Sequence, residues 1–193
     1  MKIKEMVLVG MFAALLAIIS PLQIIVPFSP VPITLQVIGI TLAATILGSR
    51  LGTLSVVMYI LLGIVGLPVF AGFTSGIPKL IGPTGGFITG FILSAFIMGK
   101  LIELKKDVHI FYMFFINIIG LIIVYSIGAI QLSIVYTHSI SKALAAGVIP
   151  FIIPDLIKLV FCSIVTIQVR KVLEKSGYLM GNKSLKANPK DHA

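Results

Sequence analysis

Runs of apolar residues that approach or exceed the thickness of a membrane constrain the fold of this sequence more than any other feature. Only 11% of the 193 residues are charged, and the mean hydropathy is +1.15. Because backbone polar groups in lipid must be satisfied within their own segment, each run is expected to be a helix. The sequence therefore predicts an all-α, polytopic membrane bundle of six transmembrane helices, and residues 1–193 are expected to form a single membrane domain. The predicted spans are residues 6–26, 33–47, 51–65, 86–102, 110–136 and 149–169.

Three of these runs leave alternatives open. The runs 33–47 and 51–65 would each reach only about 22 Å as helices, whereas a hydrocarbon core is about 30 Å thick. We expect them to extend into their turns, or one of them to span incompletely. The run 6–26 follows Lys2 and Lys4 and could belong to a signal peptide. No clear cleavage site of small residues follows it, so we expect it to be the first span.

The basic residues are distributed unevenly among the turns. With the N-terminus inside, twelve of the 15 Lys and Arg residues fall on the cytoplasmic side, two fall outside, and Lys158 lies within a span. This asymmetry predicts that both termini are cytoplasmic and that residues 170–193 form a cytoplasmic tail. It places the loops 27–32 and 66–85 outside. The net charge of +9 would suggest a nucleic-acid partner in a soluble protein, but topology explains it here, and the expected surroundings are a lipid bilayer.

Asp155 and Lys158 form the only acid and base that share one apolar run. A charge at membrane depth is costly unless it faces a partner or a cavity. At i and i+3 the two side chains lie on one helix face and can neutralise each other. Asp155 comes five residues after Pro150, about 8 Å along a helix from its outer end. The pair is either a structural ion pair between helices or a polar site for a substrate with both donors and acceptors.

Both predicted outer loops are rich in residues that break helices. Three prolines lie within residues 27–32, which predicts an ordered, rigid loop. The stretch 66–86 is rich in glycine and proline yet carries seven large apolar side chains. An apolar loop at the surface of a membrane protein is typical of a lid or a re-entrant plug. Its glycines do not form a phosphate-binding loop, because no Lys-Ser or Lys-Thr pair follows them.

The first predicted helix carries small residues at helical spacing. Gly10 pairs with Ala14, and Ala13 pairs with Ala17. Small residues let helix backbones approach each other closely in lipid. This face packs either within the chain or against another subunit.

Five short motifs occur in a fixed order along the chain. They are Pro30-Val-Pro-Ile-Thr-Leu-Gln36, Gly66-Leu-Pro-Val-Phe-Ala-Gly72, Gly82-Pro-Thr-Gly-Gly86 with Gly90-Phe91, Tyr125-x-x-Gly128, and Pro150-Phe151 with Asp155-x-x-Lys158. Together they resemble the BioY family of biotin-binding S components of energy-coupling-factor (ECF) transporters. The resemblance extends from Met6 to about Lys171, and it implies a six-helix membrane bundle.

The resemblance also implies the ligand and the partners. It implies biotin as the transported ligand and, as partners, an ECF module made of a transmembrane T component and two ATPase subunits. No cofactor is implied in this chain, since ATP is used only by the partner subunits.

The resemblance also gives the candidate residues their roles. Asp155 would accept hydrogen bonds from the ureido N–H groups of biotin, and Lys158 would donate to the ureido carbonyl. Apolar walls would come from Phe70, Phe73 and Tyr125. Backbone N–H groups of the Gly-rich segments, such as Gly72, and the ammonium of Lys79 are the candidates for the biotin carboxylate. The small-residue face (Gly10, Ala13, Ala14 and Ala17) would dock on the T component.

Two residues depart from the family pattern. Pro154 stands where the family more often has glycine, which could shift the start of the sixth helix. Gln131 stands where an aromatic residue is common after the Tyr-x-x-Gly motif. Both are expected to change details of the pocket, and neither removes the Asp155–Lys158 pair.

Two other functions are alternatives for a membrane bundle with this sequence. An intramembrane enzyme would need catalytic groups within the spans, but His109, His138 and His192 lie at span ends or in the tail. We therefore expect no enzymatic activity. A self-sufficient secondary carrier for a small vitamin-like solute is the alternative function, since Asp155 could titrate. No internal repeat points to two alternating halves.

Overall fold

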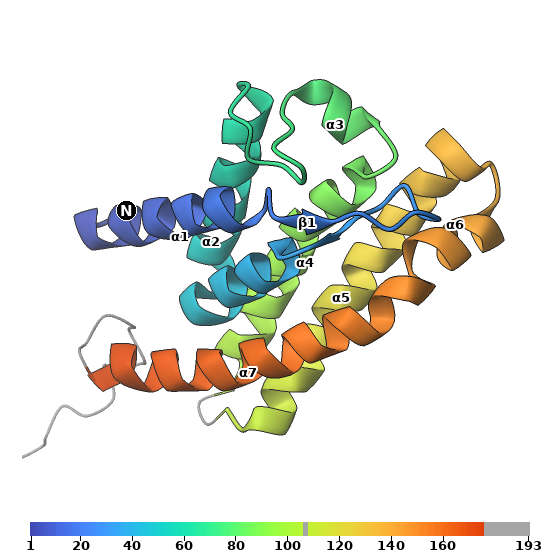
Figure 1. The fold of residues 1–193 in the computed structure, drawn as a ribbon. Coiled ribbons are helices and arrows are strands. Elements are labelled where there is room, and N and C mark those ends of the chain that lie inside the picture. The colour runs from blue at the N-terminus through green and yellow to red at the C-terminus, as the bar shows by residue number, and fades with distance from the viewer. Residues whose placement is uncertain (106–107, 176–193) are drawn as a thin grey trace, which may run out of the picture.

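The computed structural model describes residues 1–105 and 108–175. It is a bundle of helices crossed at one end by a short hairpin (Figure 1). The part of the predicted cytoplasmic tail from residue 176 onward lies outside the described residues. In chain order the elements are α1 (Ile3–Ile19), β1 (Gln23–Ile24), β2 (Ile33–Thr34), α2 (Gln36–Ile64), α3 (Ile77–Ile81), α4 (Gly85–Glu103), α5 (Ile110–Leu132), a π-helical turn (Ser133–Thr137), α6 (Ile140–Gly147), a 3₁₀ turn (Ile149–Phe151) and α7 (Ile152–Lys175).

The helices confirm the predicted all-α membrane bundle. Among the described residues, four helical stretches are long and apolar enough to cross a membrane, and they are residues 36–64, 85–103, 110–137 and 140–173. The first of these is α2, which covers most of the predicted spans 33–47 and 51–65. It is broken between them at Gly48. The 17-residue helix α1 is also strongly apolar and is about 26 Å long. The six predicted spans thus correspond to α1, the two halves of α2, α4, α5 and α7.

The first helix ends earlier than predicted. α1 stops at Ile19, whereas the apolar run continues to Val26. Pro21 explains the early end, because it has no N–H to donate to the preceding turn. The chain then pairs β1 with β2 in an antiparallel hairpin whose tip contains the predicted rigid loop 27–32.

The hairpin reaches across the bundle from the end of α1 to α6 (Figure 1). Its tip is fixed there by Ser29, whose hydroxyl donates to the carbonyl of Ala146 over 2.7 Å. Residues 140–147 lie between the last two predicted spans and form the additional helix α6. The loop 66–85 likewise contains the short helix α3, which begins next to Pro78, a residue suited to a first helical turn.

The break in α2 separates two half-helices by a single residue. Gly48 has φ +83°, a conformation that favours glycine. Glu103 caps the second half, since its carboxylate accepts from the Ser49 N–H at 2.7 Å and the Ser49 hydroxyl at 2.9 Å. Arg170 closes the first half by donating to the Thr45 carbonyl at 2.8 Å. Both charges match the helix dipoles that they meet. The predicted spans 33–47 and 51–65 are therefore separated by a break whose two helix ends are both capped, and not by a loop.

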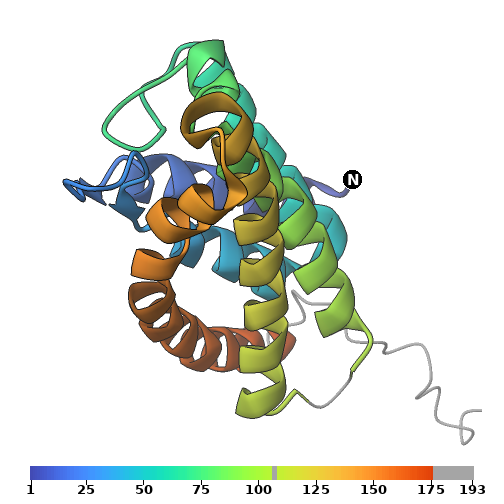
Figure 2. The ribbon, with the colours of Figure 1, turned by 90° about the vertical axis from the view of Figure 1, so that its right-hand side faces the viewer.

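The bundle core is formed mainly where α2, α4 and α5 pack together. Figures 1 and 2 both show α4 and α5 running side by side. Close approach depends on Gly99 in α4, where a Cβ atom would collide with the backbone of Ser49.

Two buried polar contacts attach α7 to this core. Thr166 and Thr45 share a hydrogen bond of 2.9 Å, and the amide of Asn117 donates to the Ser163 hydroxyl over 3.0 Å.

We predict that Glu103→Ala destabilises the protein because it removes the cap of the second half of α2. A lost helix cap costs about 1–2 kcal/mol, which corresponds to a fall of roughly 2–8 °C in the thermal midpoint for a chain of this size. Thermal unfolding in detergent measures this. Lys100→Ala is the matched control, because Lys100 is exposed and only pairs with Glu103 at 3.9 Å; its midpoint should stay near wild type. Equal midpoints for the two variants would show that the cap does not stabilise the break.

Candidate functional site

A pocket lies at the end of the bundle where the hairpin, α3 and the start of α7 meet. It contains about 580 Å³ of space not filled by protein atoms, including the solvent at its open mouth. Its apolar wall consists of Val31, Pro32, Ile33, Val37, Ala71, Phe87, Ile88, Phe91, Val124, Gly147 and Phe151. Its polar groups come from Thr34, Gln36, Lys79, Thr84, Tyr125, Asp155 and Lys158. An apolar wall with a few convergent polar groups is the usual design of a site for a small organic ligand.

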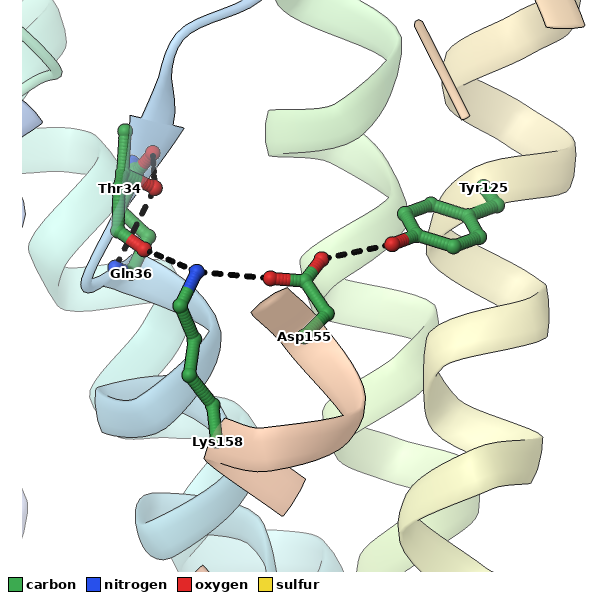
Figure 3. A network of polar contacts seen from close by, with 5 residues as sticks. All are labelled: Thr34, Gln36, Tyr125, Asp155 and Lys158. Atoms are coloured by element: carbon green, nitrogen blue, oxygen red, sulfur yellow. Dashed lines mark hydrogen bonds and ion pairs between the residues drawn. The ribbon is translucent and has the colours of Figure 1, made fainter. Parts of the chain in front are cut away.

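A line of hydrogen bonds crosses one side of this pocket (Figure 3). The Tyr125 hydroxyl donates to Oδ2 of Asp155 over 2.7 Å. Oδ1 of Asp155 accepts from Nζ of Lys158, also at 2.7 Å, in an ion pair. Nζ of Lys158 donates in addition to the backbone carbonyl of Thr34 at 2.8 Å. The predicted pair lies on α7 in the pocket wall, and it is hydrogen-bonded to α5 through Tyr125 and to the hairpin through Thr34.

The line of hydrogen bonds continues beyond the pocket toward the loop 66–85. Thr34 contacts the side chain of Gln36 at 3.3 Å, and the amide of Gln36 donates to the Tyr59 hydroxyl at 2.7 Å. The Tyr59 hydroxyl in turn donates to the carbonyl of Val69 at 3.1 Å. Gln36 and Tyr59 are both buried. The pocket wall is therefore connected by polar contacts to the segment that follows α2.

The start of α7 places the ion pair. α7 begins at Ile152, and Asp155 lies in its first turn, where a negative charge meets the positive end of the helix. Pro154 is tolerated as the third helical residue, because N–H groups in the first turn have no helical partner. Lys158 follows one turn later on the same face. The side chain of Asp155 is 6% exposed and that of Lys158 is 12% exposed, so both charges are largely withdrawn from solvent.

Lys79 brings a second positive charge to the pocket. It belongs to α3, and its half-buried ammonium lines the pocket. Within residues 1–105 and 108–175, no carboxylate lies at ion-pair distance from Lys79. Burial lowers the pKa of Lys79 below its ordinary value, because the charged form loses solvation. The pocket therefore offers a positive charge to a ligand that carries an anionic group.

The part of the chain that the structure describes holds no cluster of three or more metal-ligating side chains.

Three of the predicted substrate-binding residues are not brought to the pocket. Phe70 is buried against Tyr59, with the two ring centroids 5.8 Å apart in an edge-to-face arrangement. Phe73 is 66% exposed, with φ +57° in the turn that also contains Gly72. Gly72 lies against the side chain of Gln23 instead. Phe70 therefore packs on α2, and the aromatic rings that line the pocket are Phe87, Phe91, Tyr125 and Phe151 instead.

The sequence did not assign the aromatic wall residues Phe87, Phe91 and Phe151 to the pocket, although Phe91 and Phe151 belong to the family motifs. Phe87 and Phe91 lie one helical turn apart at the start of α4, so their i, i+4 spacing after the Gly-rich loop could have indicated a common face. The contact from Lys158 to Thr34 could not have been found in this way. It depends on a backbone carbonyl brought close by the hairpin.

The small-residue face of α1 divides into two parts. Gly10 and Ala14 are exposed, and no atom lies within 4 Å of a Cβ built on Gly10. Ala13 is only 4% exposed and belongs to the core, against which Ala17 packs while partly buried. The face was predicted to act as one unit. The structure instead assigns Ala13 and Ala17 to internal packing and leaves Gly10 and Ala14 on the surface.

The family comparison agrees with the motifs. The model of the BioY family matches residues 1–175, and the chain belongs to this family. The biotin transporter BioY of Thermotoga maritima is 43% identical over 169 residues, which cover 88% of this chain and 97% of the relative. The biotin transporter BioY2 of Lactococcus lactis is 36% identical over 185 residues, which cover 94% and 98% of the two chains.

A solved structure supports the same assignment. The S-component for biotin from an ECF-type ABC transporter matches with a TM-score of 0.82 and 30% identity, over 88% of this chain and 92% of that chain. The predicted recognition and fold class are therefore confirmed, and the chain is a multi-pass protein of the cell membrane. The relatives are transporters, in agreement with the prediction that this chain is not an enzyme.

Proposed function

We propose that this chain is the S component that captures biotin from outside the cell for ATP-driven uptake by an ECF transporter. The observation that carries the proposal is the ion pair of Asp155 and Lys158 in the wall of an otherwise apolar pocket. The names of the BioY relatives and of the matching S-component support biotin as the ligand.

The ureido ring of biotin complements this ion pair. The ring has one strong acceptor and two N–H donors. A carboxylate offers about four acceptor positions and an ammonium three donors. Among the described residues, Asp155 accepts one bond on each oxygen, and Lys158 uses two donors. Acceptor positions and one donor remain for a ligand, and charge-assisted bonds in a low dielectric are strong.

The rest of the pocket suits the rest of biotin. The thiophane ring and the valeryl chain are apolar, and Phe87, Phe91 and Phe151 provide apolar wall for them. The carboxylate of biotin would meet the half-buried ammonium of Lys79. The ligand would then lie between two charged groups of the protein, with its ureido end at α7 and its carboxylate end at α3.

The orientation and the partners complete the proposal. The distribution of basic residues supports cytoplasmic termini, so the pocket between the hairpin and α3 would open outward. The partners would be a transmembrane T component and two ATPase subunits, which hydrolyse the ATP. The exposed Gly10 and Ala14 of α1 would form the docking face for the T component, because small residues allow close helix contact in lipid.

We predict that the isolated chain in detergent binds biotin reversibly, without ATP or other subunits. Lys79→Met should weaken this binding about five- to thirtyfold, because the biotin carboxylate loses its pairing with a half-buried ammonium. Such a pair contributes about 1–2 kcal/mol to binding, a value between those of exposed and buried ion pairs. Equilibrium binding of radiolabelled biotin measures this. Biotinamide, which lacks the carboxylate, is the control ligand and should bind both forms equally. Binding that appears only with partner subunits would place the site in another chain.

We also predict that Ala14→Trp abolishes coupled uptake while biotin binding is retained, because a large ring on the exposed face of α1 prevents close docking. Uptake in cells that carry the ECF module, and binding in detergent, measure the two effects separately. Ala13→Trp is the matched variant, in which overpacking of the core should reduce folded protein. Full uptake by Ala14→Trp would contradict docking through this face.

A further inference from the structure

Gln131 makes a pair of contacts that connects two distant parts of the chain. It lies at the end of α5, and its amide nitrogen donates to the carbonyls of Leu80 at 2.8 Å and Gly82 at 2.9 Å. These carbonyls belong to the end of α3, where a short helix leaves its last acceptors without helical partners. Gln131 thus caps α3 from another helix while it does not itself line the pocket.

The surrounding backbone is shaped to bring α3 close to Gln131. A Cβ atom at Gly85 would collide with the Leu80 carbonyl and lie 2.5 Å from the Gln131 amide nitrogen. A Cβ atom at Gly86 would lie 2.7 Å from Cβ of Gln131. Side chains at these two positions would push the turn between α3 and α4 away from α5. The glycines therefore permit the contacts of Gln131.

Few other contacts hold α3 in place. None of its five residues is buried, and Leu80 is only partly buried against the core. The segment is tied at its start by the Gly76 N–H, which donates to the Gly63 carbonyl over 2.7 Å. At its end, Gln131 of α5 donates two bonds, and the Gly85 N–H at the start of α4 donates to the Gly82 carbonyl over 3.1 Å. Among the described residues, the side-chain hydrogen bonds that hold the end of α3 against α5 therefore come from Gln131, and α3 reaches the pocket through Lys79.

The position of α3 determines the position of Lys79, which the helix carries into the pocket. Building on the proposed function, we infer that Gln131 is a positioning residue that holds α3 closed over the pocket and keeps the Lys79 ammonium against the ligand carboxylate. Because Gln131 holds α3 beside the pocket, losing its contacts should speed the dissociation of the ligand.

Gln131→Met tests this inference, because methionine keeps the length of the side chain and removes both donors. Biotin dissociation from the purified chain, followed by chase with unlabelled biotin, should become about tenfold faster, as expected for the loss of two neutral hydrogen bonds. Ser133→Ala is the matched control, since the Ser133 hydroxyl donates to the Ile130 carbonyl of its own helix end. Biotin should dissociate from this variant as it does from wild type.

A double substitution separates positioning from a merely structural effect. If Gln131 acts through Lys79, then Gln131→Met should accelerate biotin dissociation much less in a Lys79→Met background than in the wild-type background. Fully additive effects of the two substitutions, or an unchanged dissociation rate in Gln131→Met, would overturn the inference.

A ligand-free measurement keeps the inference distinct from the proposed function. Spin labels at the exposed positions 77 on α3 and 134 beyond α5, in a Cys162→Ala background, should give a narrow distance distribution in wild type. Gln131→Met should broaden it or shift it to longer distances. Identical distributions would overturn the inference. Absence of biotin binding in wild type would instead refute the proposed function, while the spin-label distances still decide whether Gln131 fixes α3.

Discussion

The buried ion pair between Asp155 and Lys158 is the contact on which the pocket depends. Two charges at this depth are costly to desolvate, and their attraction offsets that cost only when further hydrogen bonds satisfy them. Tyr125 supplies one of these bonds from α5, and the Thr34 carbonyl supplies another from the hairpin. The hydrogen bonds of the pair therefore hold α5, α7 and the hairpin together at this place. The apolar wall of the pocket forms around that point.

The two ends of the pocket are built differently. The end at α7 is a closed network of buried groups in which each charge has protein partners before any ligand arrives. The end at α3 is lightly held, and its lysine has no carboxylate at ion-pair distance among residues 1–105 and 108–175. A protein that must bind its ligand tightly and still let it enter needs a rigid recognition site and a movable segment beside it, which here is α3. The hydrogen bonds from Gln131 to the end of α3 set the balance between tight binding and ligand entry.

The sequence predicted the helices well, because apolar length and helix-breaking residues are local properties. It predicted the ion pair because two charges in one apolar run are unusual and their i, i+3 spacing places them together. It failed for α6, whose eight residues are too short for a span and too polar at the start to be noticed. It also assigned Phe70 and Phe73 to the pocket, since composition cannot reveal which way a loop folds. The division of the α1 face into buried Ala13 and exposed Ala14 depends on how α1 packs on its neighbours, and spacing alone could not settle it.

The role of the ion pair in ligand recognition is tested most directly by comparing Asp155→Asn with the double change Asp155→Leu and Lys158→Met. Asp155→Asn strands a buried ammonium, which typically costs about 3–5 kcal/mol, so both stability and biotin binding should fall. The double variant removes the stranded charge and should regain much of the thermal stability. Its biotin affinity, measured at equilibrium in detergent, should remain at least a hundredfold below that of wild type. Affinity like that of wild type in the double variant would show that the pair only holds the helices together.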